Sequence, residues 1–226
     1  MKMKHKEKIM KAPVIEFKGK NYGFSTRSLI LFPIGTLLLS VLMIQFLEIR
    51  ANFWLHEIIA KHAVFVLNTL FNLRAEAVFV PEYYYPWTIS LPGDLGTYID
   101  NGCTGIIAVS IFVAIIIFTP HSQESKTNED IIWRKTTGII AAVTLIYLFN
   151  VFRIALQNYL YYQGFSWNGI HDSLAALSII VVVHIFIFLI CNRHIPEFFI
   201  SIYYSGKLIY HMRANLDPQK EYQKRY

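Results

Sequence analysis

The chain has 226 residues, 54% of them hydrophobic and 16% charged, with a formal net charge of +6 and a mean hydropathy of +0.39. Several apolar runs approach the ~20 residues that a helix needs to cross a bilayer, so the sequence predicts an integral membrane protein. The basic residues lie beside these runs, where they fix orientation by staying in the cytoplasm. We therefore interpret the positive charge as a topology signal and exclude nucleic acid as a partner.

The N-terminal segment, residues 1–27, is basic and is expected in the cytoplasm, with only Glu7 and Glu16 opposing its lysines. The first apolar run, 28–49, is too long for a signal-peptide core, and no small-residue cleavage site follows it. We expect a retained membrane span.

Residues 53–73 are apolar but include Glu57 and Lys61, which are one helical turn apart and can form an ion pair. A single crossing here would invert all later spans and place the basic end of loop 121–135 outside. We therefore predict an amphipathic helix lying in the outer membrane interface. Whether this segment dips into the membrane as a re-entrant hairpin stays open.

The segment 75–100 has two β-rich patches separated by Pro81 and Pro86, followed by the turn sequence "LPGD". It predicts a short β-hairpin-like element on the outer surface. The tyrosines and Trp87 of this segment suit a membrane–water interface.

Three more runs, 102–119, 137–156 and 171–191, qualify as spans, and the basic tail 193–226 is expected in the cytoplasm. The predicted fold class is an all-α polytopic membrane protein. It has about four transmembrane helices in a membrane domain of residues 28–192, with the interfacial helix and the β-hairpin-like element on its outer side.

This topology brings three reactive side chains to one membrane depth. A helix rises ~1.5 Å per residue, so 103–120 and 136–153 each cover about 27 Å, close to the hydrocarbon thickness. Cys103 opens an inward span, Arg153 ends an outward span, and His171 opens the last inward span. All three are expected at the outer edge, where embedded ionisable groups are candidates for function.

A cysteine at a helix N-terminus is a candidate nucleophile, because the helix dipole favours the thiolate. Gly102 and Gly105 flank Cys103 and would let a substrate backbone approach. The alternative is that Cys103 is an ordinary buried small hydrophobe. Cys191 lies at the opposite end of a span, so it cannot pair with Cys103 and is interpreted as structural.

His171 can accept the thiol proton and later donate it to a leaving amine. Arg153 can stabilise an oxyanion or hold a carboxylate, although it could instead extend to the outer headgroups. Asn150 precedes Arg153 by three residues and shares its helix face. Asp172 is a weak candidate to orient His171, because adjacent helical residues point in different directions.

The stretches "GDLGTYIDNGCTGI", "NVFRI" and "GIHD" resemble the exosortase/archaeosortase family, over roughly residues 87–192, with this chain a short bacterial-type variant. The family pattern is Cys-Ser/Thr/Ala-Gly, then Asn-x-x-Arg, then a histidine opening a late span. It matches Cys103, Thr104, Gly105, Asn150, Arg153 and His171.

The resemblance implies a cysteine peptidase or transpeptidase in the cytoplasmic (inner) membrane, with its site facing outward. Its substrates would be membrane-anchored proteins with C-terminal sorting signals, whose new carboxyl end passes to an envelope acceptor molecule. No cofactor is expected. Two alternatives remain: a non-enzymatic scaffold whose Arg153 pairs with an acidic group of a partner, and a small transporter. The zinc-like stretch "HEIIAKH" places His56 and His62 on different helix faces, so no metal site is predicted.

Overall fold

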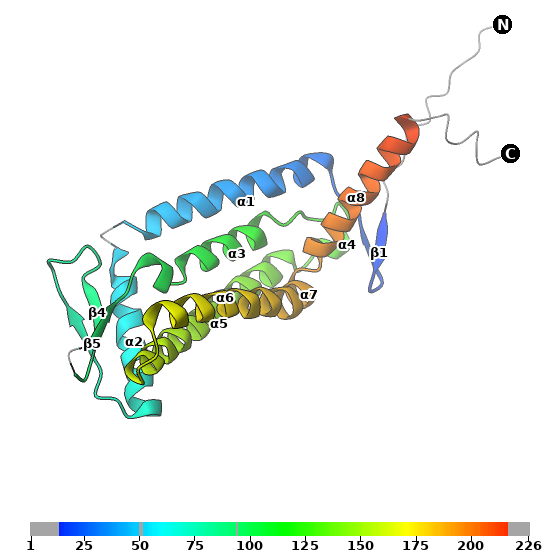
Figure 1. Ribbon diagram of the computed structural model, residues 1–226. Coiled ribbons are helices and arrows are strands. Elements are labelled where there is room, and N and C mark those ends of the chain that lie inside the picture. Colours follow the sequence, from blue (N-terminus) through cyan, green and yellow to red (C-terminus); the bar gives the residue numbers. More distant parts are fainter. Residues whose placement is uncertain (1–13, 50–51, 94, 217–226) are drawn as a thin grey trace, which may run out of the picture.

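The computed structural model describes residues 14–49, 52–93 and 95–216, and within them it is mostly helical. Four helical segments run side by side along the long axis of the molecule (Figure 1). They are α1 (Thr26–Leu47), α3 (Ile106–Phe118), α5 (Ile131–Tyr162) and α6 (Trp167–Ile185), the last continued by the π-helix η3 (Phe186–Cys191). This arrangement confirms the predicted polytopic fold class.

Three segments are long and apolar enough to cross a membrane: α1, α6, and α5 taken together with the short helix before it, as Ser125–Tyr162. The apolar helix α3 is shorter, at 13 residues. It packs closely on α1, because a Cβ at Gly35 would lie only 2.1 Å from the ring of Phe118. A glycine at this position therefore sets how near the two helices can approach.

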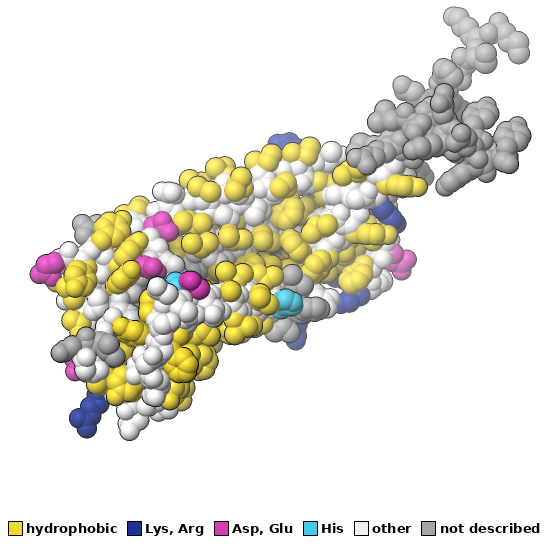
Figure 2. Space-filling model, in the orientation of Figure 1, with side chains coloured by type: hydrophobic (Ala, Val, Ile, Leu, Met, Phe, Trp, Pro, Cys, Tyr) yellow, Lys and Arg dark blue, Asp and Glu magenta, His cyan; other side chains and the backbone are white. Residues whose placement is uncertain are grey.

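Apolar side chains cover the middle of the visible face, and charged side chains gather toward its two ends (Figure 2). On α1, Leu37 is 68% exposed and Leu38 is 60% exposed. Such a large exposed apolar surface is destabilising in water but is favourable against lipid. The side-chain pattern thus agrees with a bundle that spans a bilayer.

At one end of the bundle, here called the α2 end, helix α2 (Trp54–Phe71) lies crosswise to the other helices (Figure 1). It is a single continuous helix, and a small antiparallel sheet lies beside it. The sheet has three strands, β3 (Glu76–Phe79), β4 (Trp87–Leu91) and β5 (Leu95–Tyr98). The expected hairpin-like element corresponds to β3 and β4. The structure adds a third strand, β5, directly after the "LPGD" turn.

The core at the α2 end joins the helix, the sheet and the bundle. Ile59 and Leu67 of α2 are buried with Ile89 of β4 and Ile154 of α5, and Cys103 belongs to the same cluster. Burying side chains from several elements in one cluster fixes their relative positions.

The opposite end, here called the α8 end, has elements that hydropathy did not predict. A short hairpin pairs β1 (Ile15–Phe17) with β2 (Lys20–Tyr22), so part of the basic N-terminal segment is ordered. The short helix α7 (Asn192–His194) begins at the last residue of the predicted membrane domain, and the predicted tail contains the 20-residue helix α8 (Glu197–Leu216). The four-residue helix α4 (Ser125–Asn128) lies in the loop before α5.

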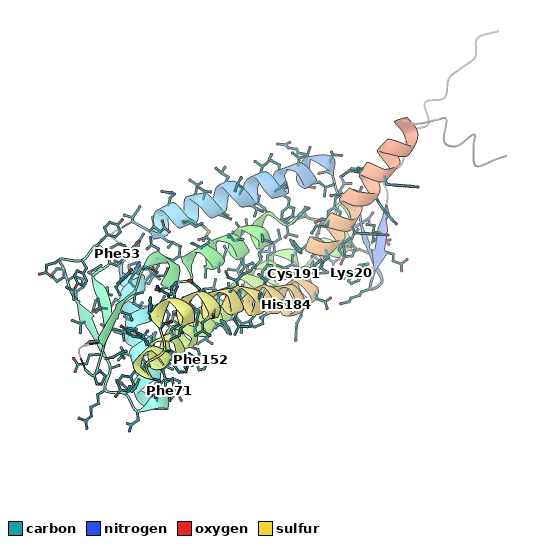
Figure 3. All side chains as sticks on the ribbon, in the orientation of Figure 1. Lys20, Phe53, Phe71, Phe152, His184 and Cys191 are labelled. Atoms are coloured by element: carbon teal, nitrogen blue, oxygen red, sulfur yellow. The ribbon has the colours of Figure 1, made fainter. Side chains whose placement is uncertain are left out.

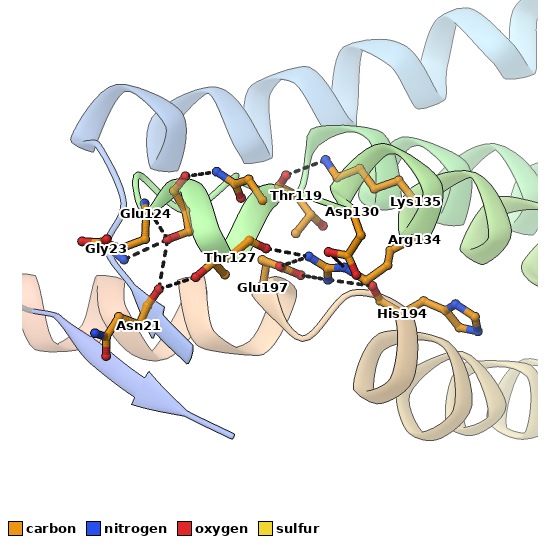
Figure 4. Close-up of polar contacts among 12 residues, drawn as sticks. Asn21, Gly23, Thr119, Glu124, Thr127, Asp130, Arg134, Lys135, His194 and Glu197 are labelled. Carbon is orange, nitrogen blue, oxygen red and sulfur yellow. Dashed lines mark hydrogen bonds and ion pairs between the residues drawn. The ribbon is translucent and has the colours of Figure 1, made fainter. Parts of the chain in front are cut away.

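A buried ion pair fastens α8 to the bundle (Figure 4). Glu197 is fully buried and accepts two hydrogen bonds from Arg134, at 2.7 and 3.0 Å, while Arg134 also contacts Asp130. Lys135 donates to the main-chain oxygens of Ile117 and Thr119, both at 2.8 Å. Buried charges are costly without partners, so separating α8 from α5 would leave Glu197 unpaired. These contacts therefore hold α8 against the bundle.

Candidate active site

Cys103 lies in a short 3-10 helix, η2 (Asn101–Cys103), here called the Cys103 turn. The carboxylate of Asp100 caps this turn by accepting a hydrogen bond from the Cys103 N–H at 2.8 Å. Gly105, with φ of +72°, separates the turn from α3. The prediction that Cys103 opens the membrane helix was therefore wrong, because α3 begins only at Ile106, after the left-handed Gly105.

The Cys103 side chain is only 4% exposed and packs into the cluster under α2 and the sheet. Burial raises the pKa of the Cys103 thiol to about 12, and the nearby Asp100 carboxylate acts in the same direction. The Arg153 guanidinium acts against both. The expectation that a helix N-terminus lowers this pKa was wrong, since the thiol is outside α3 and beside a carboxylate.

The carboxamide of Asn150 connects the Cys103 turn to Arg153. Its nitrogen donates to the Cys103 main-chain oxygen, and its oxygen accepts from the Arg153 Nε and Nη2 at 3.3 and 3.0 Å. Arg153 Nη2 also lies 3.5 Å from the Gly102 main-chain oxygen. Arg153 is 7% exposed, so its guanidinium is held inside the protein rather than extended outward. We call these contacts the Asn150–Arg153 clasp.

Thr104 and Gly105 shape the backbone after the cysteine. The Thr104 hydroxyl donates to the Asn101 main-chain oxygen at 2.7 Å and so closes the turn. At Gly105 an added Cβ would lie 3.4 Å from the Asn150 Cγ, and the positive φ is strained for other residues. In the structure this glycine makes room for Asn150, a role that the sequence did not suggest.

His171 lies in the first turns of α6, with 35% of its side chain exposed. Its Nδ1 is 3.4 Å from the Asp172 carboxylate, and its ring packs on Trp167 with centroids 5.6 Å apart. Within the described part of the chain, the imidazole has no hydrogen bond to Cys103 or Arg153. Asp172, the weak candidate to orient His171, makes its contact with the imidazole through a side chain that is 88% exposed.

Gln157 links the Asn150–Arg153 face of α5 to α6, and it was not among the predicted site residues. It is 1% exposed, and its Nε2 lies 3.4 Å from the main-chain oxygen of His171. Asn150, Arg153 and Gln157 follow the i, i+3, i+7 spacing of one helix face. That spacing in an apolar helix is a signal that could have identified Gln157.

A cavity of about 430 Å³ opens between α3, α5 and α6, next to the clasp. Its polar wall consists of Asn101, Gly102, Asn150 and Arg153. The rest is almost entirely apolar: Gly105, Ile107, Ala108, Ile111, Phe112, Ile146, Phe149, Ala175, Ser178, Ile179, Val182 and Val183. Cys103 directly follows the lining residue Gly102, while its own side chain belongs to the core cluster.

The second cysteine is remote from this site. Cys191 is a free, buried thiol packed with residues such as Phe112 and Phe186, and it lies away from the Phe53 end of the molecule (Figure 3). Across the described ranges, no group of three or more His, Cys, Asp or Glu residues could hold a metal ion.

The structure thus defines a multi-pass membrane protein with a cysteine, an arginine and a histidine at one end of its bundle, beside an apolar cavity. The family model for transmembrane exosortases matches residues 21–190. The chain belongs to the transmembrane exosortase family, as the sequence motifs suggested. No curated protein and no solved structure gives a significant match.

Proposed function

We propose that this exosortase is a cysteine transpeptidase or protease that cleaves C-terminal sorting signals of exported proteins at the outer face of the membrane. The observation that carries the proposal is the Asn150–Arg153 clasp. It fixes the main chain on both sides of the Cys103 Cα, next to the largely apolar cavity between α3, α5 and α6. A substrate helix beside this cavity would present its scissile bond to the Cys103 turn. Holding the bond close to the thiol in this way would accelerate the attack.

The proposed reaction begins when His171 accepts the proton of the Cys103 thiol. The thiolate attacks the scissile carbonyl carbon and forms a C–S bond, and Arg153 stabilises the charge on the oxygen. The C–N bond then breaks, and the leaving amine takes the proton from His171. An envelope acceptor or water attacks the resulting thioester, His171 accepts the proton of this nucleophile, and the thiol leaves with a proton restored.

This mechanism requires the thiol and the imidazole to converge on bound substrate. In the structure Cys103 is buried with a high pKa, and His171 is partly exposed. Pairing with His171 supplies the activation that the buried thiol lacks, because a thiolate–imidazolium pair stabilises the charged sulfur.

The scaffold alternative needs an Arg153 that is available to a partner. Arg153 is 7% exposed and lines the cavity, so a substrate in the cavity can reach its guanidinium, whereas a partner on the surface of the bundle cannot. The transporter alternative needs a polar path, whereas the cavity wall is apolar away from the clasp. The contacts favour the enzyme over both.

The proposal is tested by expressing Cys103→Ala beside an exported protein that bears a C-terminal sorting signal. We expect the unprocessed form to accumulate, while Cys191→Ala, the matched control, leaves processing unchanged. Normal processing in the Cys103→Ala strain would show that this thiol is not the nucleophile.

A further inference from the structure

His56 of α2 is a buried histidine that the proposed mechanism does not use. It is 0% exposed, and its Nε2 lies 3.1 Å from the Oδ1 of Asn101, the first residue of the Cys103 turn. Its ring packs between Phe53 and Tyr85, with centroids 4.7 and 5.8 Å away. The aromatic contacts hold the imidazole in one orientation, with one nitrogen directed at the turn.

Burial lowers the pKa of His56, with Asn101 and Asp100 acting against that shift, so the ring is neutral at pH 7. A neutral imidazole carries one N–H and one acceptor nitrogen. Because its partner is the carboxamide oxygen of Asn101, we assign the proton to Nε2. The other nitrogen, Nδ1, is buried and has no hydrogen-bond partner among the described residues.

Asn101 couples this contact to the site. Its main-chain oxygen accepts from the Thr104 hydroxyl, and Asn101 itself forms part of the polar cavity wall. The Cys103 turn is therefore held from two directions. The clasp on α5 binds its carbonyl groups, and His56 on α2 binds the side chain at its start.

We infer that His56 is a positioning residue of the cysteine site, which holds the Cys103 turn in place through its Nε2–H···Oδ1 hydrogen bond to Asn101. The predicted effect of His56 on cleavage rests on the proposed function. The predicted effect of His56 on the reactivity of the Cys103 thiol does not depend on that function. Without the donor, Asn101 loses the one hydrogen bond to α2 that it makes within the described part of the chain, and the turn loosens over the buried thiol.

The test compares His56→Phe, which keeps an aromatic ring, with His56→Gln, whose amide nitrogen can reach the position of Nε2. The matched control is His62→Phe, because His62 is an exposed histidine on the same helix. Each full-length protein is purified in detergent. The rate of Cys103 alkylation by N-ethylmaleimide is followed by mass spectrometry of the peptide that contains Cys103, and cleavage is measured separately.

We expect His56→Phe to raise the alkylation rate of Cys103 and to lower the cleavage rate, each about tenfold, the size of effect that follows the loss of one buried hydrogen bond. His56→Gln should stay near wild type in both measurements, and His62→Phe should leave alkylation unchanged. An unchanged alkylation rate in His56→Phe would overturn the inference. So would a failure of His56→Gln to restore it, or an equal rise in His62→Phe. The alkylation result stands even if Cys103→Ala still processes substrate, so the two proposals can fail separately.

Discussion

Replacing Asn150 by alanine should slow cleavage by an amount that follows directly from the hydrogen bonds of the site. The change removes the acceptor of two Arg153 N–H groups and the donor to the Cys103 main-chain oxygen. Hydrogen bonds to a charged group contribute ~1.5–3 kcal/mol, and a neutral one contributes ~1 kcal/mol. Because both Arg153 bonds share the one Asn150 oxygen, we count them as a single charged interaction of ~2 kcal/mol, and with the neutral bond the clasp is expected to lose ~3 kcal/mol. If this loss falls on the transition state, cleavage slows on the order of 100-fold.

The assay is the rate of processing of a sorting-signal substrate per amount of folded enzyme. Asn150→Asp should retain more activity than Asn150→Ala, because a carboxylate still accepts from Arg153. It cannot donate to Cys103, so it should remain below wild type. The matched control is Asn158→Ala on the same helix, since Asn158 is a buried asparagine whose partners are Thr97 and Ile154.

Asn158→Ala is expected to lower thermal stability and to keep the specific activity near wild type. The reasoning would be refuted if Asn150→Ala processed substrate within about twofold of wild type, since a lost charged hydrogen bond predicts more. It would equally fail if Asn158→Ala lost as much specific activity as Asn150→Ala.

Three other predictions concern the turn and the α8 end. Gly105→Ala places a Cβ near Asn150 at a positive φ and should lower the unfolding free energy by ~1–2 kcal/mol in thermal melts, whereas an unchanged melt would argue against the strained turn. Asp100→Asn removes a carboxylate that raises the Cys103 pKa, so alkylation at pH 8 should be faster than in wild type, and a slower rate would contradict the assigned cause. Glu197→Ala removes the fully buried partner of the half-buried Arg134, which keeps its contact to Asp130, and should destabilise the protein by about 3 kcal/mol. An unchanged melting temperature in this variant would contradict the prediction.

The membrane helices could be predicted from the sequence, because helices that contact lipid need long apolar runs. The apolar runs located α1, α5 and α6, and the family resemblance was confirmed. The contact between Asn150 and Arg153 also follows from local geometry, since i and i+3 residues share a helix face. These features depend on composition and helical period alone.

The features that were missed depend on tertiary contacts. The Cys103 turn is separate from α3 because Asp100 caps the turn and Gly105 adopts a left-handed conformation, and neither effect has a hydropathy signal. The position of His56 beside Asn101 depends on how α2 packs across the bundle, which a 45-residue separation in sequence does not reveal. Helix α8 was interpreted as a tail because its docking contact, the Arg134–Glu197 pair, joins residues far apart in the chain.

Direct trapping of the thioester is the sharpest test of the central claim that Cys103 attacks a peptide carbonyl. Enzyme incubated with a sorting-signal substrate and no acceptor is digested, and the peptide that contains Cys103 is analysed by mass spectrometry. The account predicts an added mass equal to the substrate fragment that ends at the cleavage point, and hydroxylamine should remove it. Cleavage that proceeds without any adduct on this peptide, and that continues in Cys103→Ala, would contradict the account.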